Sequence, residues 1–163
     1  MTKFFETLEE RKMNTIKSVN KQALPALMTI WESSVHATHS FLSVEEIDAL
    51  KPEVRNALLE IEHLYGYYAP NLIGFIGIEN KKVDMLFVDA SYRGQGIGKK
   101  LLQYALDTFH VGSVDVNEEN RQGLGFYTHM GFQVDSRSAL DGQGNPYPIL
   151  HLKNDLEEDG HEN

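Results

Sequence analysis

The segment 82–109, KVDMLFVDASYRGQGIGKKLLQYALDTF, constrains the fold more than any other part of the chain. It begins with a short apolar run at 83–88, whose composition favours a buried strand. Glycines then alternate at positions 94, 96 and 98. From Ile97 onward, apolar residues recur at helical spacing and give the segment one apolar face. The sequence therefore predicts a strand, a glycine-rich loop and a helix in direct succession.

A glycine-rich loop at the start of a helix is suited to hold a phosphate. The first backbone N–H groups of a helix lack partners within it, and the helix dipole makes that end positive. Glycines let an anion approach these groups closely. Arg93, Lys99 and Lys100 add positive charge there, in a chain whose formal net charge is -9. The alternative is a plain strand-to-helix connection with a solvated basic edge. Three alternating glycines argue against this alternative, because they cost conformational entropy unless a ligand uses them.

The spacing of the loop excludes two well-known phosphate-binding motifs. A P-loop fails because Arg93 stands where that motif requires a glycine. A dinucleotide-binding G-x-G-x-x-G fails because positions 99 and 101 hold lysine and leucine. The pattern that fits is Arg/Gln-x-x-Gly-x-Gly/Ala, which is met by Arg93, Gly96 and Gly98.

This loop resembles the pyrophosphate-binding loop of the GNAT superfamily of acyl-CoA-dependent N-acetyltransferases. A second signature of that family agrees with it in order and spacing: N-x-x-N at 117–120, F-Y at 126–127 and G-F at 131–132. A narrower resemblance, to the YjaB-type bacterial acetyltransferases, is carried by IWESSVHATHSFL, VNEENRQGLGFY and DGQGNPYPIL. The likeness covers roughly residues 16–152, nearly the whole chain.

The pattern of apolar and turn residues predicts an α/β (mixed α+β) domain. Strands are expected at 14–19, 65–69, 72–78, 83–88, 114–117, 132–137 and 147–152, and helices at 24–35, 43–64, 97–109 and 121–130. Pro52 is expected to divide the second helix, and Pro146 and Pro148 favour an edge position for the last strand. Gly74 and Gly77 suggest a bulge or a close backbone approach.

The resemblance implies the GNAT fold, a mostly antiparallel twisted sheet with a central splayed parallel strand pair and flanking helices. The strands at 83–88 and 114–117 are expected to be that pair, because a helix joins them. The domain is expected to span 13–153, between an N-terminal extension at 1–12 and an acidic disordered tail at 154–163. The size fits one compact domain.

The resemblance also implies that acetyl-CoA binds along the strand and the loop, and that its pantetheine arm enters the gap between the splayed strands. Asn120 is expected to cap the following helix and to contact the pantetheine. The residues expected to bind acetyl-CoA are Leu86, Phe87, Val88, Arg93, Gly94, Gln95, Gly96, Ile97, Gly98, Lys99, Asn120 and Tyr127.

The reaction implied is attack of an amine on an acetyl thioester. Backbone N–H groups near Phe87 and Val88 are expected to polarise the carbonyl where the strand bulges. Tyr127 is the candidate general acid for the departing thiolate. The general base stays open among Asp84, Glu79 and His39. Alternation along the strand predicts that Asp84 faces the same side as Leu86 and Val88.

Two histidines stand three residues apart, at His36 and His39. They can be polar residues near a helix end, a metal pair or a wall of the acceptor pocket. A metal would need a third ligand, which the sequence does not indicate, so we expect no metal. We expect His39 to line the acceptor pocket or to act as the base.

Composition and charge narrow the class of function. The acidic balance argues against a nucleic-acid partner, and it disfavours a toxin that acetylates aminoacyl-tRNA. The chain has no cysteine, no run of membrane-spanning length and no signal-peptide pattern, so we expect a cytoplasmic protein, monomeric or homodimeric. The predicted function is transfer of an acetyl group from acetyl-CoA to a primary amine of an unidentified acceptor. A non-catalytic sensor or partner module that binds acetyl-CoA or CoA is the alternative.

Overall fold

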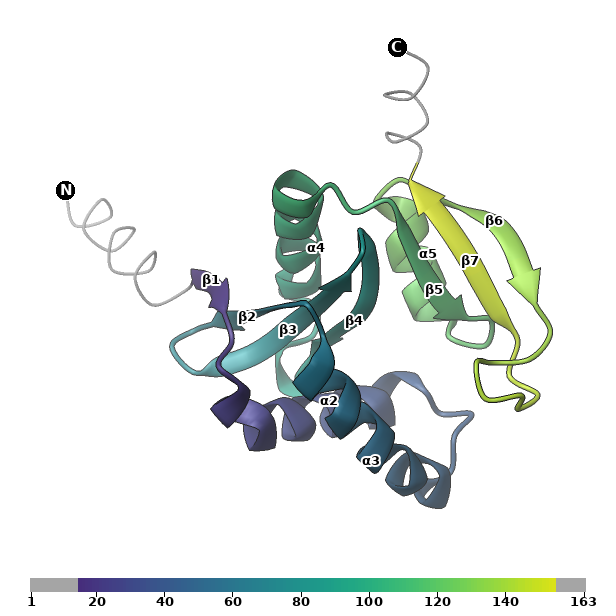
Figure 1. Ribbon diagram of the computed structural model, residues 1–163, viewed down its shortest axis with the longest axis horizontal. Helices are drawn as coiled ribbons and strands as arrows, with labels where there is room; N and C mark the ends of the chain where they lie inside the picture. The colour runs from purple at the N-terminus through teal and green to yellow at the C-terminus, as the bar shows by residue number, and fades with distance from the viewer. Residues whose placement is uncertain (1–14, 155–163) are drawn as a thin grey trace, which may run out of the picture.

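A seven-stranded sheet in the order β1-β2-β3-β4-β5-β7-β6 forms the centre of the computed structural model, which describes residues 15–154 (Figure 1). The strands are β1 (Thr15–Ser18), β2 (His63–Tyr68), β3 (Leu72–Glu79), β4 (Lys82–Val88), β5 (Ser113–Asn117), β6 (Phe132–Ser138) and β7 (Ile149–Asn154). The α-helices are α2 (Leu24–Thr38), α3 (Val44–Glu60), α4 (Ile97–Phe109) and α5 (Arg121–His129), and the 3-10 helices are η1 (Lys21–Ala23) and η2 (Ala90–Tyr92). None of the described helices is both long and apolar enough to cross a membrane.

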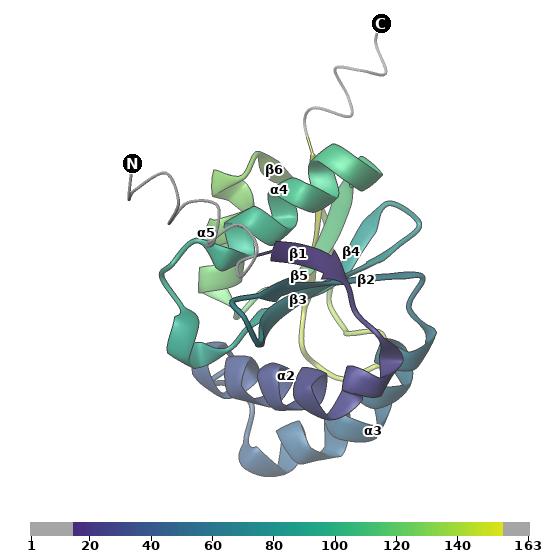
Figure 2. The same ribbon diagram turned by 90° about the vertical axis from the view of Figure 1, so that its left-hand side faces the viewer.

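The helices form a layer on each face of the sheet, with α2 and α3 on one side and α4 on the other (Figure 2). The α2–α3 layer buries Phe75 and Met85 from the sheet. The other layer, with α4 and α5, buries Ile76, Val114 and Leu152. The sheet is therefore the partition between two separate apolar cores, each of which stabilises the fold by removing apolar surface from water.

The parallel pair β4–β5 is short, and the two strands then separate. They pair only at Lys82↔Ser113 and Val83↔Val114, whereas every other neighbouring pair among the described strands is antiparallel and longer. Helix α4 joins β4 to β5, as a parallel connection requires. This confirms the predicted splayed parallel pair at the centre of a mostly antiparallel sheet.

A bulge lies in β4 at Asp84. Gly77 pairs with Met85 and Ile78 pairs with Val83, so Asp84 is an extra residue without a partner on β3. The extra residue breaks the alternation that was expected to place Asp84 with Leu86 and Val88, so that expectation was wrong. The bulge also lies at Asp84 and not near Phe87 and Val88, which pair regularly with β3. Gly74 is a position of close approach, because a Cβ there would lie 3.2 Å from the Phe87 carbonyl oxygen.

Helix α3 and strand β7 differ from the prediction. The capping box at Ser43 and Glu46 starts α3 as expected, but the helix continues through Pro52 and ends at Glu60 instead of near residue 64. It ends there because residues 63 and 64 pair with β3. Strand β7 starts after the two prolines and lies between β5 and β6, so the edge strand is β6.

The predicted segments at the two ends of the chain fall almost entirely outside the described residues. The extension at 1–12 and the tail from residue 155 onward are not part of the described structure. Asn154, which was assigned to the tail, is the last residue of β7 and is buried.

Candidate active site

A cavity of about 520 Å³ lies where β4 and β5 separate. Its wall is formed by these two strands, the start of α4, helix α5 and the end of α2. The predicted site residues that line it are His39, Asp84, Leu86, Phe87, Val88, Arg93, Gly94, Gly96, Ile97, Gly98, Lys99, Asn120 and Tyr127. Gln95 and Glu79 are not part of the lining. The structure therefore brings together in one cavity residues that lie almost ninety positions apart in the sequence.

The glycine loop turns the chain into α4 through two left-handed residues. Gly94 and Gly96 both have φ of 79°, and Gly96 is the N-cap of α4. A Cβ at either position would meet nothing within 4 Å, so these glycines are required by their backbone angles and not by crowding. The open space beside them leaves the first N–H groups of α4 accessible to an anion.

Arg93 ties this loop to α5, because its guanidinium donates a hydrogen bond to the side-chain carbonyl of Gln122. Both residues line the cavity. The Ala90 N–H donates to the Ser33 hydroxyl at 3.0 Å, which fixes the preceding turn against α2. The ammonium of Lys100, by contrast, lies 5.7 Å from the centre of the Tyr67 ring and is not part of the cavity wall.

The backbone N–H groups of β4 point alternately toward β3 and toward the gap between β4 and β5. The Asp89 N–H donates to the Ile73 carbonyl at 2.8 Å, which makes that pair a hydrogen-bonded one. Hydrogen-bonded pairs recur at every second residue of an antiparallel ladder, so the Phe87 N–H also points to β3. The N–H groups of Leu86 and Val88 consequently point to the side of β5, into the gap.

Two asparagines shape the turn between β5 and α5. The Asn117 side chain accepts a hydrogen bond from the Glu119 N–H at 2.9 Å. The Asn120 side chain accepts one from the Gly123 N–H at 3.0 Å, which confirms the predicted N-cap of α5. These bonds set the direction of α5 and thereby the place of Tyr127 in the cavity wall.

Tyr127 is only 8% exposed and lies between two other aromatic rings. Its ring packs edge-on against Phe126 and Phe132, at centroid distances of 5.0 and 5.8 Å. Burial raises the pKa of the Tyr127 phenol above its ordinary value. The hydroxyl therefore stays protonated at physiological pH and is available as a donor.

Helix α2 ends at Thr38, three residues later than predicted, and its C-cap His39 lines the cavity. Burial lowers its pKa, so the ring is neutral at pH 7. The Thr38 hydroxyl donates to the Ser34 carbonyl and also contacts His39 Nδ1 at 2.7 Å. When the Thr38 hydroxyl donates to Ser34, Nδ1 of His39 is the donor to that hydroxyl, and Nε2 carries the lone pair. His36 lies 3.7 Å from Glu32 and does not line the cavity.

Two carboxylates stand where the strands part, and sequence reasoning identified only one of them. Asp84 of β4 and Asp115 of β5 both line the cavity. Burial raises the pKa of Asp84, and the nearby negative charges of Glu79 and Asp115 add to this against the opposing effect of Lys82. The signal for Asp115 was in the sequence. It alternates with the buried Val114 and Val116, and must therefore face the other side of the sheet.

Comparisons with known proteins agree with this geometry. The family model described as "Acetyltransferase (GNAT) domain" matches residues 31–144. The peptidyl-lysine N-acetyltransferase YjaB of Salmonella typhimurium is 39% identical over 139 residues, covering 77% of this chain and 88% of the relative. The YjaB protein of Escherichia coli is also 39% identical, covering 77% of this chain and 86% of the relative.

The same likeness holds in three dimensions. The solution structure of apo-form YjaB from Escherichia coli superposes with a TM-score of 0.78 at 37% identity, covering 86% of this chain and 96% of that one. The PaiA N-acetyltransferase of Thermoplasma acidophilum, solved in complex with coenzyme A, shares the fold with a TM-score of 0.66 at 24% identity, covering 86% of this chain and 98% of that one.

Proposed function

The chain belongs to the GNAT acetyltransferase family, and from this premise we propose that it transfers the acetyl group of acetyl-CoA to the side-chain amine of a lysine in a peptide or protein. The observation that carries the proposal is the cavity between β4 and β5. It joins a glycine loop at a helix N-terminus, a protonated phenol and two carboxylates in one space.

The residues around the gap fit acetyl-CoA. The left-handed Gly94 and Gly96 leave open space beside the start of α4, where N–H groups suit a pyrophosphate. Arg93 adds a cation to the same wall. The N–H groups of Leu86 and Val88 face the gap, and we assign to them the polarisation of the acetyl carbonyl. The Phe87 N–H, which was expected to share this task, is directed at β3.

Acetyl-CoA supplies an activated acyl group, and the residues of the chain supply the proton transfers. The acceptor amine must lose a proton before it attacks, and Asp84 and His39 Nε2 are the candidate bases in the cavity wall. We favour Asp84, because its carboxylate also attracts the ammonium form of the acceptor. Tyr127 gives a proton or a hydrogen bond to the departing thiolate. The phenol is protonated at neutral pH, and its raised pKa favours the hydrogen bond over complete proton transfer.

A lysine acceptor is supported by charge and by kinship. The two YjaB relatives are named as peptidyl-lysine N-acetyltransferases. The cavity presents the carboxylates of Asp84 and Asp115, and the chain carries a formal net charge of -9. Such a surface attracts cationic peptides and speeds their encounter.

The test is release of CoA thiol from acetyl-CoA with a lysine-containing peptide whose N-terminus is acetylated, followed by mass spectrometry of the peptide. We expect stoichiometric thiol release and a mass gain on lysine. The control is the same peptide with arginine in place of lysine, which should stay unmodified. Tight binding of acetyl-CoA without thiol release for any amine would contradict the proposal and favour a non-catalytic acetyl-CoA sensor.

A further inference from the structure

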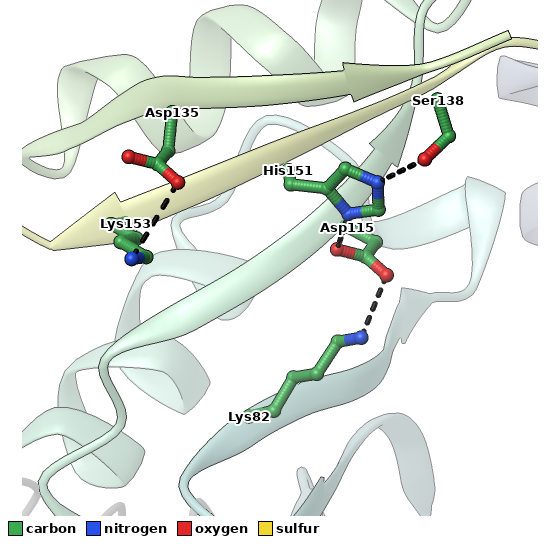
Figure 3. Close-up of polar contacts among 6 residues, drawn as sticks. All are labelled: Lys82, Asp115, Asp135, Ser138, His151 and Lys153. Carbon is green, nitrogen blue, oxygen red and sulfur yellow. Dashed lines mark hydrogen bonds and ion pairs between the residues drawn. The ribbon is translucent and has the colours of Figure 1, made fainter.

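A row of polar side chains crosses four neighbouring strands on the sheet face opposite α5 (Figure 3). It begins at Lys82 on β4 and continues through Asp115 on β5 and His151 on β7 to Ser138 on β6. The adjoining residues Val114 and Leu152 face the α5 side and are buried there. The row therefore lies on the same side of the sheet as α2, the side from which His39 reaches the cavity.

Each link in this row is a short contact. Lys82 Nζ donates to Asp115 Oδ2 at 2.7 Å, and His151 Nδ1 lies 2.7 Å from Asp115 Oδ1. His151 Nε2 lies 2.7 Å from the Ser138 hydroxyl. Asp115 and His151 are directly opposite each other in the β5–β7 ladder, so the backbone register holds this contact in place.

The ladder also fixes where Asp115 stands relative to the proposed chemistry. Val83↔Val114 is the last pair of β4 with β5, and Asp115 is the next residue after it. The bulged Asp84 occupies the corresponding place on β4. The two carboxylates thus stand on either side of the point where the strands part, and both line the cavity.

The two carboxylates have opposite electrostatic environments. Against the effect of burial, the hydrogen bonds from Lys82 and His151 lower the pKa of Asp115 below its ordinary value. Burial raises the pKa of Asp84 instead, and the charge of Asp115 contributes to this. Paired carboxylates whose pKa values are pushed apart in this way commonly divide their roles, one as base and one as permanent charge.

Resting on the proposed lysine acetyltransferase function, we propose that Asp115 is a second carboxylate that binds the acceptor ammonium beside Asp84, and that His151 is the residue that positions it. The ammonium N–H bond breaks and its proton passes to the Asp84 carboxylate, which leaves the amine lone pair free to attack. Asp115 stays ionised throughout and keeps the nitrogen at the point where the strands part.

His151 can hold the Asp115 carboxylate with either a neutral or a protonated ring. An ionised Asp115 requires a proton on Nδ1, so the neutral ring offers the Nε2 lone pair to the Ser138 hydroxyl. When the ring is protonated, Nε2–H donates and the hydroxyl accepts, because a serine hydroxyl can do both. The contacts of His151 with Asp115 and Ser138 are therefore possible for both forms of the ring.

Six charged or titratable groups surround the two carboxylates. They are Lys82, Glu79, His39, His151 and, further along the sheet, Asp135 and Lys153.

The first experiment is Asp115→Asn with a lysine peptide as acceptor. We expect the peptide KM to rise at least about tenfold, since one ammonium contact is lost, while the KM for acetyl-CoA is unchanged. The acid limb of the kcat/KM profile should move to lower pH, because Asp84 loses a repelling neighbour.

The matched control is Asp135→Asn. It removes the same charge from the same sheet face, where Asp135 lies 3.5 Å from Lys153, but Asp135 does not line the cavity (Figure 3). This variant should keep the wild-type peptide KM and pH profile. Equal effects of the two substitutions would reduce the role of Asp115 to bulk surface charge and overturn the proposal.

The role of His151 is tested by two substitutions. Asparagine can place its side-chain N–H near the position of Nδ1–H, whereas alanine cannot, so His151→Asn should keep a peptide KM close to wild type and His151→Ala should raise it. A purely structural His151 would not be rescued by asparagine. Loss of peptide turnover in both variants, with normal folding by circular dichroism, would contradict the positioning role.

A readout without turnover separates this inference from the proposed function. The Asp84 carboxyl can be titrated by carbon-detected NMR in the wild type and in Asp115→Asn, and its midpoint should fall in the variant. A wild-type protein that never acetylates lysine peptides contradicts the proposed function alone. An unchanged Asp84 midpoint in Asp115→Asn contradicts the coupling of the two carboxylates, whatever the acceptor.

Discussion

Tyr127 combines a buried ring with a place in the cavity wall, so its hydroxyl can be removed with little effect on packing. We predict that Tyr127→Phe folds and binds acetyl-CoA like the wild type but loses at least about tenfold in kcat, since positioned acid catalysis contributes about 10²–10⁴ in rate. Steady-state kinetics with a lysine peptide measure this loss. Tyr67→Phe is the matched control, because Tyr67 is also buried but lies outside the cavity wall. A wild-type kcat in Tyr127→Phe, where chemistry limits the rate, would mean that the proton comes from elsewhere.

His39 makes the free energy of unfolding depend on pH. Burial lowers its pKa below the ordinary value of about 6.5, so the unfolded chain takes up a proton first as the pH falls. The stability from the neutral ring is fully present above pH of about 6.5 and decreases as the pH falls toward the lowered folded-state value. Urea unfolding at pH 7.5 and 5.5 should therefore show a smaller acid loss in His39→Asn. An equal acid loss in the wild type and in His39→Asn would contradict this role of His39.

The individual residues of the site were predictable to different degrees. Tyr127 and the loop glycines stand in local patterns, and a single sequence carries such patterns. Asp115 was visible as a polar residue between two buried valines, but its proximity to Asp84 depends on the pairing of two distant strands. The contact of Asp115 with His151 is still less local, because it requires the register of the β5–β7 ladder.

At the scale of the element, the loop before α4 depends on one backbone conformation. Gly96 has φ of 79°, where a residue with a Cβ is strained by about 1–2 kcal/mol. We predict that Gly96→Ala destabilises the fold by about that amount and weakens CoA binding, measured by chemical unfolding and calorimetry. Gly125→Ala is the matched control. Gly125 is an exposed residue within α5 with open space around it, so alanine there should stabilise the helix by up to about 1 kcal/mol. Equal effects of both substitutions would contradict a special role for the left-handed turn.

Most elements could be predicted, and the failures have physical causes. The strand–loop–helix at β4 and α4 has strong local signals, and so does the capping box of α3. The end of α3 was placed too late because the apolar pattern of residues 61–64 suits a helix as well as a strand, and pairing with β3 decides between them. Strict alternation placed Asp84 on the wrong face, since one extra residue in a strand reverses every side chain beyond it.

At the scale of the whole molecule, ligand binding between the two halves of the sheet should stabilise the entire fold. We predict that CoA or acetyl-CoA in hundredfold excess over its dissociation constant adds about 2.7 kcal/mol to the free energy of unfolding. A thermal shift assay measures this, and Gly96→Glu, which places a negative charge at the proposed pyrophosphate site, should abolish the shift. An unchanged melting temperature with millimolar CoA would contradict binding at this loop.

The fold as a whole followed from order and spacing in the sequence. Two separated signatures, joined by the helix α4, were enough to predict the parallel pair at the centre of the sheet and the gap between its strands. The position of β7 inside the sheet was not predictable from its prolines, because they only restrict where the strand can begin.

The short pairing of β4 with β5 leaves the sheet with a seam across its middle, joined by two residue pairs. Amide protons along the seam have no strand opposite them, so those of Leu86 and Val88 should exchange quickly with deuterated solvent. The amide proton of Phe87 should exchange slowly, because this N–H points to β3. A pantetheine arm lying in the seam would act as a missing strand and protect Leu86 and Val88 selectively. Hydrogen exchange measured by NMR with and without CoA would show this protection residue by residue. No change at the amides of Leu86 and Val88 would show that the ligand binds elsewhere.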